Sequence, residues 1–448
     1  MNRRCTTRRL LAGLTVGVLL AGCAGSAGSA SPTTAPVATT SASVPSVAPA
    51  SVPSVAPTPD MTAAPSATPV NLGATWTASA GLPWAVAVTA GIRGWVAVGS
   101  ARPVDDPGSE YAAPAAWAST DGSAWTRSTS VAMPTGTNTG EMTAITSAAT
   151  GLFAAGTVNL TAGTVWRSVD GSTWDVIGSG PLFDLGPCVE GCASLTSIAA
   201  GPAGIVVTGY RVIPPAPPTD VKAQSVGVAD AEHRVMQTAS KVGIETDVWH
   251  SADGTSWQRV PVPTVAAAVP AAEMSVVARD GSFIAAGSLC ESNGTTCRAV
   301  TWTSADGRAW APPVDLPNGT GARALQLATG PGGNVVLGMR CDKKGCPSAI
   351  WASADGTTWK EGVLVGDFIE GSTQLASAGD RFMVLSSKDG EVAVWTSSDG
   401  LEWAKLTVEP GLVPAFPATQ IVDLAGRRNG ALAIGYSREE KPGVWVSP

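Results

Sequence analysis

Short segments in which apolar and small residues alternate recur along the chain from about residue 73 to the C-terminus. Examples are G-L-F-A-A-G-T-V at 151–158, S-F-I-A-A-G-S-L at 282–289 and N-V-V-L-G-M-R at 334–340. A second strand-like segment stands before each of them, such as M-T-A-I-T-S-A-A at 142–149, with turn residues in between. Short period-two segments bounded by turns predict an all-β fold.

One motif, W-x-S-x-D-G-x-x-W, punctuates these segments and marks an internal repeat. Its six complete copies run from Trp117 to Trp125, Trp166 to Trp174, Trp249 to Trp257, Trp302 to Trp310, Trp351 to Trp359 and Trp395 to Trp403. The first tryptophans are 49, 83, 53, 49 and 44 residues apart. The unit is therefore about fifty residues long, and one unit carries an insertion at about 213–247.

The letters inside the motif predict a tight hairpin turn. Serine favours the first turn position, and glycine tolerates the left-handed backbone that ends a three-residue hairpin loop. Serine and aspartate side chains accept hydrogen bonds from turn amides. In the third copy this register pairs Ser251 with Thr255 and Trp249 with Trp257. The residues to which we assign this structural role are Ser119, Asp121, Gly122, Ser168, Asp170, Gly171, Ser251, Asp253, Gly254, Ser304, Asp306, Gly307, Ser353, Asp355, Gly356, Ser397, Asp399 and Gly400.

The two ends of the repeat region carry complementary halves of a seventh motif. The chain ends Val444-Trp445-Val446-Ser447-Pro448, and the repeat region begins Gly73-Ala74-Thr75-Trp76. Four short strands per unit are typical of a β-propeller blade, and joining the halves closes a ring without exposed sheet edges. We therefore expect residues 73–448 to form a seven-bladed β-propeller of four-stranded blades, with N- and C-terminal strands sharing the last blade.

At these motifs the sequence resembles the Asp-box, or bacterial neuraminidase repeat, family of β-propellers, whose usual pattern is S-x-D-x-G-x-T-W. In this chain aspartate and glycine are adjacent, which shortens the turn by one residue. The family includes sialidases, xyloglucan-cleaving hydrolases, sortilin-type receptors and assembly factors, so the resemblance implies a fold and leaves the activity open. It also implies that the Asp box is structural and lies away from any substrate.

The N-terminus reads as a bacterial lipoprotein signal. Residues 1–23 combine a basic start with a short apolar run that ends Leu20-Ala21-Gly22-Cys23, which looks like a lipobox. Such a signal implies lipidation at Cys23, with an ordinary secretory signal as the alternative. Residues 24–72 are rich in Pro, Ser, Ala and Thr and contain no aromatic residue, which predicts a disordered tether. The expected location is the extracytoplasmic side of the cell membrane, reached by the general or the twin-arginine export route.

The remaining cysteines support export. Beyond residue 23 they form three close pairs, Cys188 with Cys192, Cys290 with Cys297 and Cys341 with Cys346. An even set of six in short loops predicts disulfides in an oxidising compartment. Zinc binding at Cys188 and Cys192 is the alternative interpretation. The chain has only His233 and His250 to complete such a site, so we expect neither a metal nor another cofactor.

Charge and motif content narrow the functional classes. The net charge is −7, and residues 73–448 hold 24 basic against 34 acidic side chains, which argues against nucleic-acid binding. A sialidase-like mechanism needs clustered arginines and a tyrosine beside a glutamate. The chain has three tyrosines, Tyr111, Tyr210 and Tyr436, and no recognisable arginine motif. Loop carboxylates that a two-carboxylate hydrolase could use are Asp105, Asp106, Asp184, Asp315 and Asp367.

Sequence variation among the repeats is concentrated in the connections between second and third strands. They include C-E-S-N-G-T-T-C, C-D-K-K-G-C and the insertion at 213–247, which has a helix-like stretch, while the motif turns keep one length. Variable loops on a rigid scaffold often carry function, although surface loops also tolerate insertion. We therefore expect a monomeric, non-catalytic propeller that binds a protein or cell-wall glycan, with a sialidase-like or xyloglucanase-like glycoside hydrolase as the alternative.

Overall fold

The computed structural model describes residues 76–79, 82, 84–101, 112–188, 192–213, 243–264, 268–291, 296–341, 346–364, 372–388, 391–406, 420–436 and 442–447. All of them belong to the compact unit Asn71–Pro448. The expected signal peptide, lipidation site and tether lie outside the described residues, as does most of the insertion.

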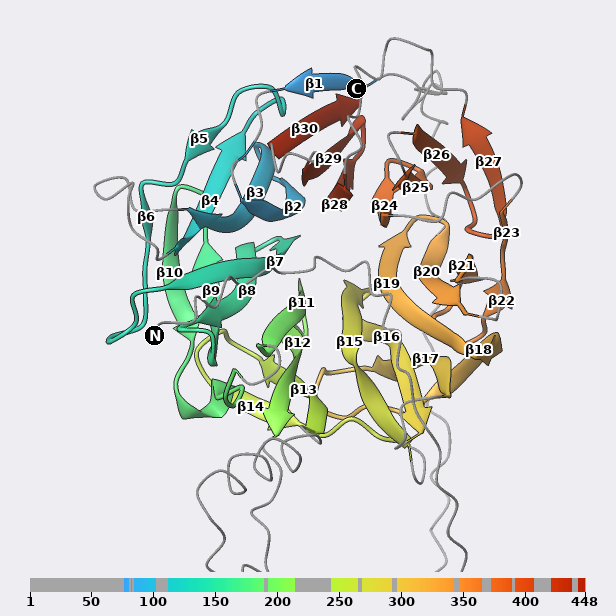
Figure 1. The fold of residues 1–448 in the computed structure, drawn as a ribbon, viewed down its shortest axis with the longest axis horizontal. Helices are drawn as coiled ribbons and strands as arrows, with labels where there is room; N and C mark the ends of the chain where they lie inside the picture. Colours follow the sequence, from blue (N-terminus) through green and yellow to red (C-terminus); the bar gives the residue numbers. More distant parts are fainter. Residues whose placement is uncertain are drawn as a thin grey trace, which may run out of the picture. The chain divides into compact units, whose positions relative to one another are not determined.

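Within these residues thirty strands form seven sheets, arranged as blades around a central axis (Figure 1). The predicted seven-bladed β-propeller is thus confirmed. The inner strands are β2 Ala85–Gly91, β7 Gly140–Ala148, β11 Ser194–Gly201, β15 Ala268–Arg279, β19 Ala322–Gly330, β24 Ser372–Ala378 and β28 Gln420–Arg427. They belong to blades 1 to 7 in that order.

Each inner strand pairs with the next strand along the chain. The second strands are β3 Gly94–Ala101, β8 Gly151–Val158, β12 Gly204–Ile213, β16 Ser282–Glu291, β20 Gly333–Arg340, β25 Arg381–Lys388 and β29 Gly430–Tyr436. The third strands are β4 Ala113–Ser119, β9 Ala162–Ser168, β13 Gly243–Ser251, β17 Cys297–Ser304, β21 Ser348–Ser353, β26 Glu391–Ser397 and β30 Pro442–Ser447. Because β13 begins at Gly243, the inserted segment is shorter than the sequence pattern indicates.

The outer strands are β5 Thr126–Arg127, β10 Thr173–Gly178, β14 Trp257–Val260, β18 Val314–Thr320, β22 Lys360–Glu361, β27 Glu402–Leu406 and β1 Thr77–Ser79. Two short strands, β6 Ser130–Val131 and β23 Val363–Leu364, add a fifth strand to blades 2 and 6 by parallel pairing. A single turn of 3₁₀-helix, η1, spans Pro181–Phe183 between blades 2 and 3.

The ring closes as predicted, through a blade shared by the two ends of the chain. Strand β1 pairs antiparallel with β30, with Thr77 opposite Val446 and Ala78 opposite Trp445. The two strands lie side by side at the C-terminus in Figure 1. This pairing supplies the outer strand of blade 7, so its sheet has the same four-strand order as its neighbours.

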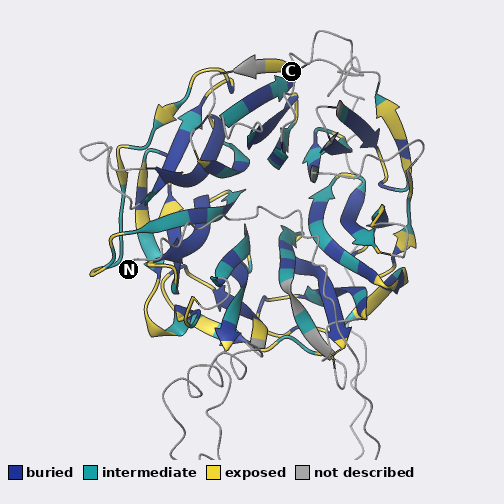
Figure 2. Ribbon diagram, in the orientation of Figure 1, coloured by how far each residue is buried: buried dark blue, intermediate teal, exposed yellow. Residues whose placement is uncertain are grey.

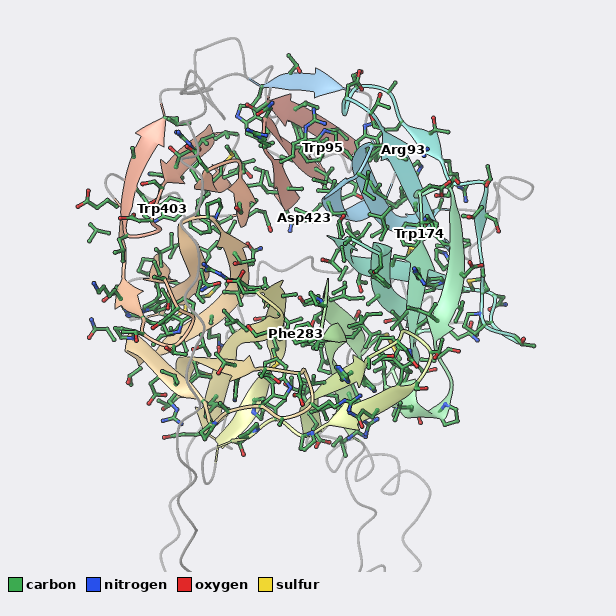
Figure 3. The ribbon with its side chains drawn as sticks, turned by 180° about the vertical axis from the view of Figure 1, so that it is seen from behind. Arg93, Trp95, Trp174, Phe283, Trp403 and Asp423 are labelled. Atoms are coloured by element: carbon green, nitrogen blue, oxygen red, sulfur yellow. A yellow bond between two sulfur atoms is a disulfide. The ribbon has the colours of Figure 1, made fainter. Side chains whose placement is uncertain are left out.

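The hydrophobic core lies between neighbouring blades. Apolar side chains of one sheet pack against those of the next; Val335 of blade 5 and Trp395 of blade 6, for example, belong to one cluster. Second and third strands are buried almost throughout, whereas outer strands carry exposed residues (Figure 2). Nine tryptophans are among the largest fully buried side chains, and three of them, Trp95, Trp174 and Trp403, are labelled in Figure 3. Burial of this apolar area stabilises the ring.

Polar side chains on inner strands join blade to blade near the axis. One residue on each of four inner strands accepts a hydrogen bond from a main-chain N–H of the following blade. The pairs are Ser197 with Val276 at 3.1 Å, Ser275 with Leu327 at 3.1 Å, Gln326 with Leu375 at 2.8 Å and Asp423 with Val88 at 2.7 Å. A buried main-chain N–H needs such a partner, so these contacts fix the seams.

Candidate functional site

The ring has two faces with different content. We call the face that carries the links between blades and the second-to-third-strand connections the loop face. The opposite face, which we call the turn face, carries the hairpin turns between first and second strands and the six motif turns. The two faces follow directly from the antiparallel strand order of each blade.

The motif turns on the turn face are held by their own serine and aspartate. In the third copy the Ser251 hydroxyl oxygen accepts the N–H of Gly254 at 2.8 Å, and Asp253 accepts the N–H groups of Thr255 and Ser256, both at 2.8 Å. These main-chain donors lower the pKa of the Asp253 carboxyl below its usual range. The glycine of each of the six complete motifs has a positive φ, and its N–H donates a hydrogen bond to the serine hydroxyl oxygen in all six turns. The side chains are thereby engaged within the turn itself.

The expected register of the hairpin is wrong. Ser251 pairs with Trp257 and Trp249 pairs with Arg259, so the two tryptophans are not directly opposite each other. Five residues separate the paired positions instead of three, because the aspartate accepts two successive main-chain N–H groups and extends the loop. The tryptophans instead play separate parts in the blade.

The first tryptophan of a motif ties its blade to the outer segment contributed by the preceding blade. Its indole N–H donates to a carbonyl there in four copies, from Trp166 to Ala132, Trp249 to Leu182, Trp302 to Pro263 and Trp351 to Pro317, at 2.7–3.0 Å. The second tryptophan donates to the glycine carbonyl of its own turn in four copies, at Trp125, Trp174, Trp359 and Trp403. The repeated motif therefore acts as a structural joint in each of these blades.

The three cysteine pairs are disulfide-bonded in the structure, and all three lie on the loop face. Cys290 and Cys297 bridge the ends of β16 and β17, and Cys341 and Cys346 bridge the corresponding connection of blade 5. Cys188 and Cys192 close the link that leads into β11. Crosslinks in these connections restrict their conformations and favour a preformed surface.

An exposed tryptophan stands at the inner end of the loop face. Trp84 precedes β2, is 53% exposed and has a φ of 62°. Its ring centroid is 6.4 Å from that of Tyr436, and the hydroxyl of Tyr436 donates to the carbonyl of Ala85 at 2.7 Å. A positive φ is costly for a bulky L-residue and is found mostly where function requires it. In the sequence, Trp84 is one of only two tryptophans outside the motifs. That position could have identified it as a candidate functional residue.

Other exposed apolar side chains share the loop face. Leu160, in the β8–β9 turn, is 48% exposed with a φ of 64°, and Asn159 before it also has positive φ. Ile213 and Ile244 stand where the insertion leaves and re-enters blade 3 and are 38% and 51% exposed. Together with Trp84 they place four large apolar groups on the loop face of blades 1 to 3.

The base of the insertion is held by charged side chains. Arg211 on β12 pairs with Glu245 at 2.6 Å and with the buried Asp247, both on β13. Arg259 on β14 lies 3.6 Å from Asp247 and over the ring of Trp249. A buried carboxylate that is paired on two sides fixes the hairpin geometry at the point where the insertion begins.

The described residues do not assemble the constellation of a sialidase-like mechanism. Tyr210 donates its hydroxyl to the carbonyl of Cys192 at 3.0 Å, and burial together with Glu141 raises the pKa of Tyr436 above its usual value. Both effects oppose a nucleophilic phenolate. Among the arginines of the described inner strands, Arg279 and Arg427 end their strands at the turn face, whereas Arg323 lies at the loop-face end of β19, so the three do not gather at one end of the axis. Tyr111 falls outside the described residues.

The candidate loop carboxylates are separate from one another where they can be placed. Asp184 accepts the N–H of Gly186 at 3.0 Å, and Asp315 on the outer strand of blade 4 pairs with Arg298 on the third strand at 3.3 Å. Asp105, Asp106 and Asp367 lie outside the described residues. Within the described part of the chain no group of three His, Cys, Asp or Glu side chains could hold a metal ion. His250 contacts the carbonyl of Ala203 at 3.2 Å, and burial lowers its pKa.

No described helix has the length and apolarity needed to cross a membrane.

No protein-family model and no curated protein matches the sequence. Solved structures resemble the fold at low identity. An α-L-arabinanase of Penicillium chrysogenum complexed with arabinobiose is 15% identical, with a TM-score of 0.38 over 68% of this chain and 91% of that one. A protein of unknown function from Dyadobacter fermentans is 12% identical, with a TM-score of 0.43 over 85% and 99%. Trypanosoma rangeli sialidase with the inhibitor DANA is 10% identical, with a TM-score of 0.42 over 82% of this chain and 55% of the sialidase.

Proposed function

We propose that this protein is an exported lipoprotein that is attached to the membrane through Cys23. Its propeller is monomeric and binds a protein partner through the loop face. Binding involves no chemical step. The observation that carries the proposal is the group of four exposed apolar side chains, Trp84, Leu160, Ile213 and Ile244, on the loop face of blades 1 to 3. We call this group the apolar group.

The backbone conformation of two members supports a role beyond chance exposure. Trp84 and Leu160 both have left-handed φ values, which cost roughly 1–2 kcal/mol for an L-residue with a bulky side chain. A surface turn without a function would relieve that cost with glycine or asparagine. Strain retained at exposed large apolar residues is typical of binding sites.

The chemistry of the apolar group favours a protein over a glycan. Three of its four members are aliphatic, and aliphatic side chains offer no hydrogen bonds to sugar hydroxyls. A tryptophan and three aliphatic side chains on one face, with the Arg211–Glu245 ion pair at the base of the insertion, match the mixture of apolar anchors and polar rim found at interfaces. The Cys188–Cys192 disulfide restrains the link between blades 2 and 3, which lowers the entropy cost of association at this part of the face.

Replacing Leu160 by glutamate tests this assignment. Leu160→Glu places a charge in the proposed interface and should weaken partner capture from solubilised cell envelopes by at least about tenfold. The matched control is Val169→Glu, because Val169 is a 74% exposed aliphatic residue in a turn of the same blade on the opposite face. Equal capture by both variants, or loss in both, would contradict a loop-face interface.

Turnover would contradict the absence of a chemical step. Purified residues 73–448 are incubated with fluorogenic sialosides and a β-glucan panel, beside a variant carrying Asp184→Asn, Asp315→Asn and Asp367→Asn. We expect no hydrolysis by either protein. Hydrolysis that the triple variant loses would establish the hydrolase alternative and place carboxylate chemistry on the propeller.

Lipidation of Cys23 has its own test. Cells fed an alkyne fatty acid should label the protein, and Cys23→Ser should abolish the label because the serine hydroxyl does not replace the lipid-carrying thiol. Cys5→Ser is the matched control and should keep the label, since Cys5 lies in the segment that cleavage removes. Label retained in Cys23→Ser, or absent from the native protein, would overturn the membrane anchor.

A further inference from the structure

A cavity of about 400 Å³ opens on the turn face between blades 4 and 5. Blade 4 contributes Arg279 and Asp280 from its first turn, with Ile284 and Thr303 from neighbouring strands. Blade 5 contributes Ala354, Asp355 and Thr357 from its motif turn. A cavity of this volume is within the range of small-molecule sites. It lies on the face opposite the apolar group.

The equivalent place at the seam between blades 7 and 1 is filled. Arg427 takes the position of Arg279 at the end of its inner strand, and its guanidinium lies 4.8 Å from the ring centroid of Trp95. Its Nη1 is 3.5 Å from the carbonyl of Thr120 in the next motif turn. At the blade 4–5 seam the residue equivalent to Trp95 is Asn334, since Trp95 pairs with Ser119 as Asn334 pairs with Ser353. Because asparagine is smaller than tryptophan and not aromatic, Arg279 has no aromatic partner here among the described residues.

Two polar atoms at the seam between blades 4 and 5 lack a hydrogen-bond partner in the described part of the chain. The guanidinium Nε of Arg279 pairs with Asp280 at 3.1 Å, while its Nη1 is buried without a hydrogen bond. Asn334 is fully buried; its amide nitrogen donates to the carbonyl of Ser353 at 3.2 Å, and its Oδ1 is unpartnered. Both atoms are inaccessible to solvent and Asn334 does not line the cavity, so a ligand would be recognised by the accessible groups of the lining residues.

The lining selects a class of ligand. The negative charges of Asp280 and Asp355 would repel an anionic ligand, and the positive charge of Arg279 would repel a cationic one. Turn amides lower the pKa of the Asp355 carboxyl, which keeps it an ionised acceptor at neutral pH. Donors on Arg279 and Thr303, acceptors on the two carboxylates and the apolar surface of Ile284 together match a neutral polyol, which has both hydroxyl groups and C–H surface.

We propose that this cavity binds a single neutral sugar residue, free or at the end of a glycan, at a second site separate from the loop face. Arg279 of blade 4 and Asp355 of the neighbouring blade 5 bind its hydroxyl groups, and Ile284 contacts its ring. Among the described second strands, only that of blade 5 has asparagine at its second position. The corresponding residues elsewhere are Trp95, Leu152, Ile205, Phe283, Phe382 and Ala431.

The test uses the full chain and saturation-transfer NMR with glucose, galactose, mannose and arabinose at millimolar concentration. We expect saturation transfer to at least one sugar. Ala305→Trp should weaken that binding by at least about tenfold, because Ala305 is an exposed residue at the cavity and the indole blocks it without removing a polar group. Arg279→Leu should weaken it similarly by removing charged hydrogen bonds.

The matched control is Thr120→Trp, which places the same side chain at the equivalent exposed turn position beside the filled seam. This variant should bind sugar as the native protein does, and unchanged unfolding midpoints would show that all variants are folded. No transfer to any of the four sugars would overturn the proposal. So would binding that survives Ala305→Trp, or an equal response to sodium acetate as an anionic probe.

Discussion

Replacing Asp423 by asparagine should remove one contribution to the pH dependence of stability, the one that lowers the free energy of unfolding as the pH rises from about 4 to about 7. Asp423 lies at the inner edge of β28 and its carboxylate accepts the N–H of Val88 on β2 at 2.7 Å and its neighbour Leu424 at 2.9 Å (Figure 3). It occupies the closure seam at the position where other seams have Ser197, Ser275, Gln326 and Gln374. It is thus an ionisable residue where the corresponding residues are neutral.

The sign of the effect follows from the raised pKa. Burial raises the pKa of Asp423 to about 7, against the lowering effect of the two N–H donors. Across this window the folded protein holds a proton that the unfolded chain has released. The free energy of unfolding therefore decreases as the pH rises, by up to about 1.4 kcal/mol per pH unit, and the contribution is complete only at acid pH. Asp423→Asn cannot ionise, so it should lose this slope.

Urea unfolding at a series of pH values measures the effect. The useful quantity is the difference between the native protein and the variant, in which other titrating groups such as His250 cancel. Asp315→Asn is the control, because the side chain of Asp315 is 61% exposed and far from the closure seam; its profile should follow the native one. Parallel profiles for the native protein and Asp423→Asn would contradict a proton-binding carboxyl at the seam.

Replacing Gly307 by alanine should destabilise the ring more than the same change at Gly254. Both glycines end motif turns with left-handed φ, 75° and 78°, so both substitutions cost about 1–2 kcal/mol in backbone strain. A Cβ at 307 would also lie 2.5 Å from Cδ2 of His250 and 2.9 Å from a methyl of Val206, while one at 254 meets nothing closer than 3.5 Å. Overpacking adds about 1–3 kcal/mol at Gly307 alone.

Urea midpoints of the two alanine variants check this difference. The double variant Gly307→Ala with His250→Ala should recover part of the loss, because the imidazole that the new methyl group contacts is gone. Equal midpoints for Gly307→Ala and Gly254→Ala would show that strain alone sets the cost and that the turn of blade 4 is not packed against His250.

The repeat made the architecture predictable from sequence, because the spacing of the tryptophan–aspartate motif identifies the blade and the split seventh copy identifies the closure. The register of the hairpin was not predictable in the same way. Ser251 and Trp257 pair across five residues because Asp253 accepts two successive main-chain N–H groups, and a turn-type rule based on residue preference alone does not include that contact.

The candidate binding surface was only partly predictable. Variable connections indicated the loop face, but Trp84 and Leu160 stand out only through exposure and left-handed backbone, which depend on the assembled ring. The cavity at the blade 4–5 seam is lined by Arg279 and Asp355 from two neighbouring blades, 76 residues apart in the sequence. No local pattern brings such residues together.

Site-specific photo-crosslinking in intact cells shows whether a protein partner contacts the loop face. A benzophenone amino acid is placed at 160 in one strain and at 169 in another, so that each exposed turn of blade 2 is probed in the native envelope. We expect a discrete crosslinked protein from position 160 and none from position 169. The same adducts from both positions, or adducts from 169 alone, would contradict a loop-face interface.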